Sequence, residues 1–273
     1  MTVAEMCEMT GMTKQNFYKE KKVRTRREVD EEFIVNVVCA ERRLQPEVGA
    51  RKLLEMYGDL FREHGILIGR DCFFRLLNEK KLLVRKKRRA ARTTDSRHQF
   101  PVYVNLLKDM KLSRAHQAWV SDITYIRTQE GFVYLSLVMD AHSRKIVGFH
   151  AGNSLEAEGC LRALGKAIVQ LPKGMRPIHH SDRGSQYCCG DYVSRLMKRK
   201  ITISMTENNH CYENAKAERL NGILKQEYHL GQTFPTRRDA VSAVAQAVTI
   251  YNNRRLHTAL NYKTPAAVHE MAA

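Results

Sequence analysis

Apolar positions recur with a helical period through the first ninety residues. Gly11 and Thr13 separate a short periodic segment from a second one, and this punctuation is typical of a helix-turn-helix, although a plain helical hairpin has the same pattern. Residues 28–44 predict a longer amphipathic helix. Two more helices are expected after Gly49 and after Gly69. They form either a second helix-turn-helix or a packing unit.

The pattern changes to short β-rich segments from about residue 116. WVSDITYIRT, FVYLSLVMDA and RKIVGFHA predict three antiparallel strands, the first two joined by a turn near residues 129–130. A helix capped by Ser154 follows. The remaining segments predict, in order, the strand RPIHHSD, the helix YVSRLMKRK, the strand ITISM, and the helices NAKAERLNGILKQEYHL and RRDAVSAVAQAVTIYNN.

Three antiparallel strands followed by crossover helices predict an α/β domain with a mixed sheet, and the order fits a ribonuclease H-like fold. The fold class is therefore a ribonuclease H-like mixed-sheet core preceded by an all-α helix-turn-helix region. The expected divisions are a helical DNA-binding region at 1–90, a basic linker at 91–115, the core at 116–235, and a C-terminal helix and tail at 236–273.

Charge points to a nucleic acid as the partner. The chain has 46 Lys and Arg against 29 Asp and Glu, a formal net charge of +17, and such a surface attracts polyanions. Residues 80–97 hold nine basic residues and one acid, which favours contact with phosphates over a solvated linker. The expected DNA-binding residues are Lys14, Gln15 and Asn16 in the second helix and Lys86, Lys87, Arg88 and Arg89 in the basic run.

The sequence gives little support for a membrane protein, a secreted protein or a structural zinc protein. No apolar run is long enough for a membrane span, and the first residues do not resemble a signal peptide, so we expect a cytoplasmic, nucleoid-associated protein. The seven cysteines are scattered and are expected to be reduced. Cys188 and Cys189 follow His179 and His180, but adjacent pairs lack the spacing of a structural zinc site.

Three carboxylates stand out by their positions. Asp122 lies in the first predicted strand, Asp182 ends a short strand, and Glu218 lies near the start of a helix, with 35 residues between the last two. Converging carboxylates can hold two divalent cations for phosphoryl transfer. Taken one at a time, Asp182 can equally be a turn residue, and Glu218 can be an acid that the helix dipole favours in the first turn. Asp122 is harder to explain in this way, because an unpaired buried acid in an apolar strand is costly.

Other polar residues near these acids have weaker claims. Asp140 falls on the opposite sheet face from Asp122 if the hairpin turns at 129–130, and Glu213 lies away from the face of Glu218. Lys225, seven residues after Glu218, can contact a DNA phosphate or be a solvated lysine. The residues around Asp182 can line the mouth of the active site, but a structural role is favoured for each of them, namely His180, Ser185, Gln186 and Tyr187.

Four motifs resemble those of one protein family. WVSDITYI is similar to W-x-x-D-I-T-Y, HSDRGSQY to H-S-D-x-G-x-Q-Y, YENAKAERLNGILKQEY to D-N-A-x-x-E-x-F-x-x-x-L-K-x-E, and YNNRRLHTALNYKTPAA to Y-N-x-x-R-x-H-x-A-L-x-x-x-T-P. Over roughly residues 40–270 the chain resembles bacterial insertion-sequence transposases of the D,D-35-E type, which have a retroviral-integrase-like core. In this family a frameshift often joins an upstream helix-turn-helix frame to the catalytic frame.

The resemblance implies a catalytic and metal-binding role for Asp122, Asp182 and Glu218. It also implies two Mg²⁺ or Mn²⁺ ions and double-stranded DNA with terminal inverted repeats as substrate. The transposition it implies is of the copy type and passes through a branched or circular DNA intermediate. Because two ends must be held together, a homodimer or larger oligomer is expected. Two departures, Glu213 for Asp and Arg219-Leu220 for Ser-Phe, lie outside the triad. The alternatives are a nuclease of the same fold that only hydrolyses and a non-catalytic DNA-binding regulator.

Overall fold

The computed structural model describes residues 2–84, 101–207 and 215–272, and the chain divides into two compact units, Met1–Arg85 and Lys86–Ala273. Four of the predicted DNA-binding residues, Lys86 to Arg89, lie outside the described residues, as does Glu213. Within the part of the chain that is described, no helix is both long and apolar enough to cross a membrane.

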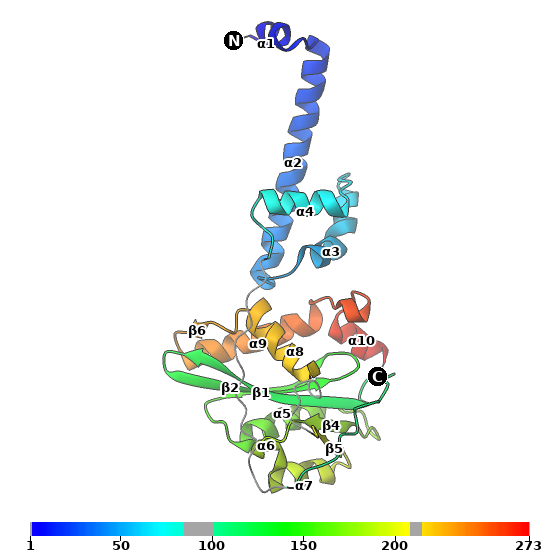
Figure 1. Ribbon diagram of the computed structural model, residues 1–273, viewed down its shortest axis with the longest axis vertical. Coiled ribbons are helices and arrows are strands. Elements are labelled where there is room, and N and C mark those ends of the chain that lie inside the picture. Colours follow the sequence, from blue (N-terminus) through cyan, green and yellow to red (C-terminus); the bar gives the residue numbers. More distant parts are fainter. Residues whose placement is uncertain (1, 85–100, 208–214, 273) are drawn as a thin grey trace. The chain divides into compact units, whose positions relative to one another are not determined.

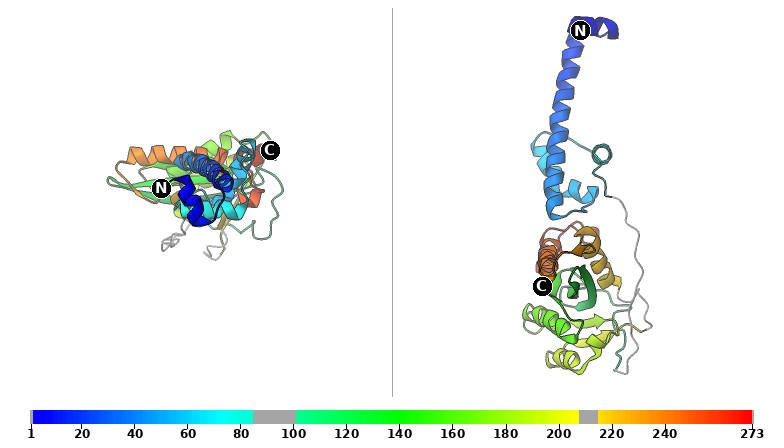
Figure 2. Two further views of the ribbon diagram at one scale, coloured as in Figure 1. Left: turned by 90° about the horizontal axis from the view of Figure 1, so that it is seen from above. Right: turned by 90° about the vertical axis from the view of Figure 1, so that its left-hand side faces the viewer.

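The N-terminal unit is all-helical. Its helices are α1 (Val3–Thr10), α2 (Lys14–Leu44), α3 (Ala50–Glu63) and α4 (Arg70–Glu79). A small apolar core joins the second half of α2 to α3 and α4, with Val38, Leu53 and Phe73 fully buried. The first half of α2 extends away from this core and carries α1 at its far end (Figures 1 and 2).

The start of α2 is confirmed, but the division of this region into two helices is wrong. Thr13 is the N-cap, and its hydroxyl accepts a hydrogen bond from the backbone N–H of Asn16 at 3.2 Å. From there α2 runs without a break for 31 residues. The pattern changes near residue 28 from polar to amphipathic, yet no Gly or Pro interrupts it. A change of pattern without a helix breaker therefore marks the edge of the core and not the end of a helix.

The second unit is built on a mixed sheet with the strand order β3-β2-β1-β4-β5. The short strand β6 pairs with the end of β1 that lies away from β4. The strands are β1 (Ala118–Thr128), β2 (Gly131–Asp140), β3 (Ile146–Gly152), β4 (Ile178–Ser181), β5 (Thr202–Met205) and β6 (Thr233–Phe234). β1, β2 and β3 are antiparallel, whereas β4 is parallel to both β1 and β5. This arrangement confirms the predicted antiparallel run, including the turn after Thr128.

Helices cover both faces of the sheet (Figure 1). One face packs against α8 (Ala215–Glu227) and α9 (Arg237–Asn253), with α10 (Pro265–Met271) beside them, and the other packs against α5 (Ala157–Val169), α6 (Ser185–Cys188) and α7 (Gly190–Lys198). The approach of α5 is close: a Cβ on Gly148 of β3 would lie 2.1 Å from the carbonyl oxygen of Ala163. The sheet is therefore the middle layer of the unit.

Several details differ from the expectations. The N-cap of α5 is Glu156 and not Ser154, because the Ser154 hydroxyl accepts a hydrogen bond from the Glu156 N–H and turns the chain before the helix begins. The short elements α6, β6 and α10 were not predicted.

Residues 101–115 of the expected linker run along the second unit. The N–H of Leu106 donates to the Ser204 hydroxyl at 2.9 Å, and Leu107 and Leu112 pack against the core under α8 and α9. This stretch therefore packs with the core. The wider division of the chain at 90, 115 and 235 stays a prediction.

Candidate active site

Asp122 faces α8 because of the two-residue period of a strand. Its neighbours of the same parity in β1, Ala118, Val120 and Ile126, lie in the core shared with α8 and α9. Trp119, of the opposite parity, lies in the core on the other face. The half-buried carboxylate of Asp122 is thus directed to the side of the sheet that carries α8.

The parallel register of β1 and β4 brings Asp182 next to Asp122. The last pair of this register is Val120 with His180, so two residues beyond each of them Asp182 comes level with Asp122. Asp182 follows β4 directly, and its Oδ1 accepts a hydrogen bond from the N–H of Gly184 at 3.0 Å. An Asp anchored at the end of a strand is therefore set beside an Asp within the neighbouring strand.

Glu218 lies in the first turn of α8, and the same helix contacts Asp122 directly. One turn further on, Asn221 donates from Nδ2 to Oδ2 of Asp122 at 2.8 Å. The Ile123 N–H donates to the other carboxylate oxygen at 2.9 Å. Asn221 was missed in the sequence, although its position three residues after Glu218 places both on one face of a helix.

The electrostatics of Asp122 show that the three carboxylates interact. The pKa of Asp122 is raised to about 7, with burial as the largest cause and the negative charge of Asp182 as the next. Glu218 raises it further, whereas the hydrogen bonds from Ile123 and Asn221 lower it. Repulsion by the other two acids thus affects the pKa of Asp122 more than the local hydrogen bonds do. A bound cation would relieve this repulsion.

The donor set fits a hard divalent cation. Carboxylate oxygens are the ligands that Mg²⁺ and Mn²⁺ prefer, and Asp122, Asp182 and Glu218 supply only such oxygens. Among the residues that the structure describes, no three His, Cys, Asp or Glu side chains form a ready-made metal cage. The metal-binding role of the triad therefore stays a prediction that rests on its chemistry and mutual repulsion.

Lys225 also lies near this site. Its Nζ is 4.4 Å from the centre of the Tyr125 ring. Burial lowers its pKa, while the charge of Asp122 acts in the opposite direction. A half-buried cation within electrostatic reach of Asp122 is suited to hold an anionic group of a substrate.

Asp140, the competing acid, belongs to a structural network. The register pairs it with Trp119, whereas Asp122 pairs with Leu137, so the two acids point to opposite faces as predicted. Asp140 is fully buried and accepts hydrogen bonds from the His116 N–H at 2.7 Å, the Ser143 N–H at 2.7 Å and the Ser143 hydroxyl at 2.8 Å. Its oxygens are occupied by the protein itself.

The residues around Asp182 mostly support the fold. His179 lies in β4, where it pairs with Trp119 of β1, and its Nε2 is 2.8 Å from the Ser121 hydroxyl and 2.9 Å from that of Tyr192. Burial lowers the pKa of His179 to about 3, so the ring is neutral.

The four flanking residues considered above divide into two groups. His180 and Tyr187 are buried, and His180 Nδ1 lies 2.9 Å from the Ser204 hydroxyl. Ser185 is exposed, and Gln186 donates from Nε2 to the carbonyl oxygen of Leu155 at 3.0 Å. His180 and Tyr187 therefore do not line an open mouth of the site.

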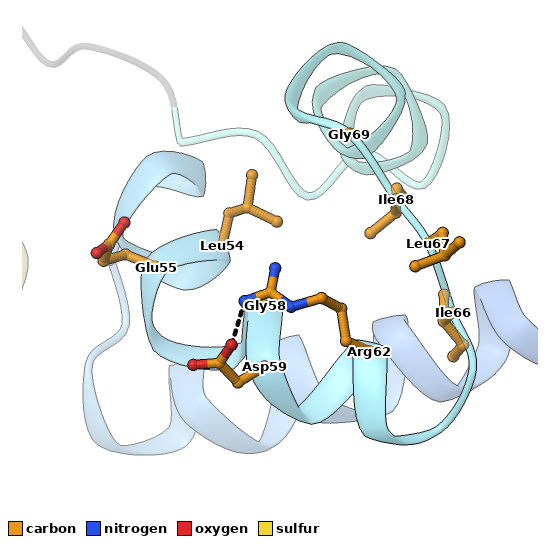
Figure 3. A pocket seen from close by; sticks show the side chains of 9 residues that line it. All are labelled: Leu54, Glu55, Gly58, Asp59, Arg62, Ile66, Leu67, Ile68 and Gly69. Carbon is orange, nitrogen blue, oxygen red and sulfur yellow. Dashed lines mark hydrogen bonds and ion pairs between the residues drawn. The ribbon is translucent and has the colours of Figure 1, made fainter.

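The predicted DNA-reading residues Lys14, Gln15 and Asn16 are exposed in the first turn of α2. Elsewhere in the N-terminal unit, a pocket of about 470 Å³ lies between α3 and residues 66–69 (Figure 3). Arg62 and Asp59 form an ion pair within it, and Ile66, Leu67 and Ile68 make one wall. Its lining is a poor match for phosphoryl transfer, because one of its two acids is already paired.

Comparison with known proteins identifies the family. Residues 113–211 and 199–265 match two families that are both described as Integrase core domain. The chain is 35% identical to the Insertion element IS600 uncharacterized 31 kDa protein of Shigella sonnei, over 98% of this chain and 100% of that protein. It is 33% identical to the Transposase for insertion sequence element IS629 of the same organism, over 80% of this chain and 72% of that protein.

A solved structure supports the fold. The chain superposes with a TM-score of 0.50 and 19% identity on a chain from the "CryoEM structure of simian T-cell lymphotropic virus intasome in complex with PP2A regulatory subunit B56 gamma", covering 80% of this chain and 73% of that one. The predicted ribonuclease H-like class is thereby confirmed. The integrase-core matches and the two relatives agree with the mixed sheet. The chain therefore belongs to the insertion-sequence transposases with an integrase core domain.

Proposed function

We propose that the protein cleaves the ends of its element and joins the released 3′ ends to DNA, with Asp122, Asp182 and Glu218 as catalytic residues. The observation that carries this proposal is the parallel register that sets Asp182 beside Asp122, next to the helix that bears Glu218. The raised pKa of Asp122, to which both other acids contribute, supports the same grouping.

The reaction consists of two phosphoryl transfers. Water attacks the phosphodiester at the element end, the P–O3′ bond breaks, and a 3′ hydroxyl is released. That hydroxyl then attacks the phosphorus of a second phosphodiester; a new P–O3′ bond forms, the P–O3′ bond of the attacked strand breaks, and its 3′ oxygen leaves as a hydroxyl. Bound Mg²⁺ or Mn²⁺, with two ions per site, would activate the attacking oxygen and stabilise the leaving one.

The protein's own groups prepare this site. Asn221 and the Ile123 N–H fix the orientation of the Asp122 carboxylate, and the Gly184 N–H does the same for Asp182. Lys225, which interacts electrostatically with Asp122, would neutralise a phosphate of the DNA. The carboxylates are thereby held ready before the metal and the DNA arrive.

The remaining parts of the proposal concern partners. The helical N-terminal unit and the basic run around Lys86–Arg89 would bind the terminal repeats, and a homodimer or larger oligomer would pair the two ends. The relatives named above are bacterial, which supports action on bacterial DNA in the cytoplasm.

The test is a strand-transfer assay with labelled element ends, target duplex and Mg²⁺. We expect both 3′ cuts and joined products from the wild type, and neither from Asp182→Asn. Asp191→Asn is the matched control, because Asp191 is an exposed acid of the same unit, in α7, and should leave both steps intact. Cuts without joined products would favour the nuclease alternative, and DNA binding without cuts would favour the regulator.

A further inference from the structure

The first half of α2 packs against no part of the hydrophobic core of the N-terminal unit. Every residue from Tyr18 to Val29 is exposed, and Phe17 is only half-buried where α1 approaches. Helices in water owe most of their stability to a packed face. A helix that is exposed on all sides is therefore best explained by intrahelical ion pairs together with a partner.

Charge is arranged differently along the two parts of this segment. Arg24, Arg26 and Arg27 pair with the acids four residues later, Glu28, Asp30 and Glu31, at 3.0, 3.0 and 2.8 Å. These i,i+4 pairs neutralise one another and stabilise the helix.

The preceding turns carry unpaired cations. Over the described ranges 2–84, 101–207 and 215–272, no carboxylate forms an ion pair with any of four lysines, namely Lys14, Lys19, Lys21 and Lys22. The single acid among residues 14–27 is Glu20. Within the exposed half of α2, unpaired positive charge therefore lies in the part nearest α1.

Most of this charge lies on one side of the helix. At roughly 100° per residue, Lys14, Lys21 and Lys22 fall within about 100° of arc, with Tyr18 between them and Glu20 on the opposite side. Tyr18 is 57% exposed. α1 adds two acids and no base, so the basic face belongs to α2 alone and is open to solvent.

We propose that this basic face, defined by Lys14, Tyr18, Lys21 and Lys22, binds the phosphate backbone of duplex DNA without regard to sequence. Lysines on a rigid helix match a line of phosphates by charge, and the ion-paired stretch behind them acts as a stiff support. The inference rests on the proposed function, since it assigns to one surface a share of the DNA binding that transposition requires.

The experiment compares two full-length double variants that remove equal charge from the same exposed helix, Lys21→Gln/Lys22→Gln and Arg24→Gln/Arg27→Gln. Binding to a labelled element-end duplex and to a shuffled duplex is measured by anisotropy between about 50 and 300 mM KCl. Each lost phosphate contact lowers the slope of log Kd against log salt by about 0.9. The lysine variant should lose about 1.8 on both duplexes, and the arginine variant less than half of that.

Controls separate the possible failures. Lys21→Arg/Lys22→Arg should retain the wild-type slope, and circular dichroism should show the same helix content in all variants. Equal losses in the lysine and arginine variants, or an unchanged slope in the lysine variant, would overturn the inference, as would a lysine variant that loses self-association in sedimentation while it binds DNA normally. Failure of the proposed function has another signature, the absence of strand transfer by the wild type.

Discussion

Two aspartates on neighbouring strands occupy opposite chemical surroundings. Asp140 of β2 is fully buried and accepts three hydrogen bonds from His116 and Ser143. Asp122 of β1 lies on the other face of the sheet, accepts two, and is repelled by Asp182 and Glu218. The protein thus supplies hydrogen-bond donors to both oxygens of Asp140, whereas Asp122 remains subject to repulsion by two other acids.

The difference separates an acid that holds the fold from one that awaits a ligand. Donors that surround a buried carboxylate satisfy its oxygens, and the carboxylate links the elements that supply them. Neighbouring carboxylates, by contrast, destabilise the ionised form of Asp122 until a cation binds. Mutation should therefore affect activity at Asp122 and stability at Asp140.

The largest expected effect is on chemistry. Asp122→Asn, Asp182→Asn or Glu218→Gln should each reduce cleavage and joining by at least about 10³-fold, because loss of one ligand misplaces a metal. DNA binding should remain, as measured by anisotropy at fixed salt. A single variant of the three with near wild-type strand transfer would remove that residue from the catalytic set.

Stability should change most at Asp140. Asp140→Asn leaves at least one buried donor without an acceptor, which should lower the free energy of unfolding by about 2–4 kcal/mol. Urea titration measures this loss. The fraction that remains folded should keep its strand-transfer activity; an inactive but stable Asp140→Asn protein would contradict the structural role.

The pH dependence of stability should differ between metal-free wild type and Asp122→Asn. The pKa of Asp122 rises from 3.8 to about 7 on folding, so between these values the folded state binds more protons and stability falls as pH increases. The loss should be on the order of 1–3 kcal/mol and should level off above pH 7. Asp122→Asn should lack it, and Mg²⁺ should restore stability in the wild type at pH 8. Thermal unfolding from pH 4 to 8 checks each point.

Asn221 should have the smallest effect. Asn221→Ala removes a hydrogen bond to ionised Asp122, so activity should fall by about tenfold and its pH profile should move to higher pH. Asn252→Ala is the matched control, because among the described residues Asn252 bonds only the backbone of Ile146, so the change should alter stability without moving the profile. Identical profiles for both variants would place Asn221 outside the site.

Local signals in the sequence were sufficient for much of the fold. β-rich alternation predicted β1, β2 and β3 with their turn after Thr128, and apolar spacing predicted α9 from Arg237 to Asn253. Thr13 was identified as the cap of α2 by its side-chain chemistry. These features depend on neighbours within a few residues, which is why the chain itself carries them.

Long-range contacts decided what the sequence left open. The short pairing of β6 with β1 and the contact of Asn221 with Asp122 depend on residues far apart in the chain. The sequence by itself determined which acids were available and which strands and helices carry them. Only the tertiary structure decided that Asp122 meets repelling carboxylates while Asp140 meets donors, because burial and charge at a site depend on every element packed around it.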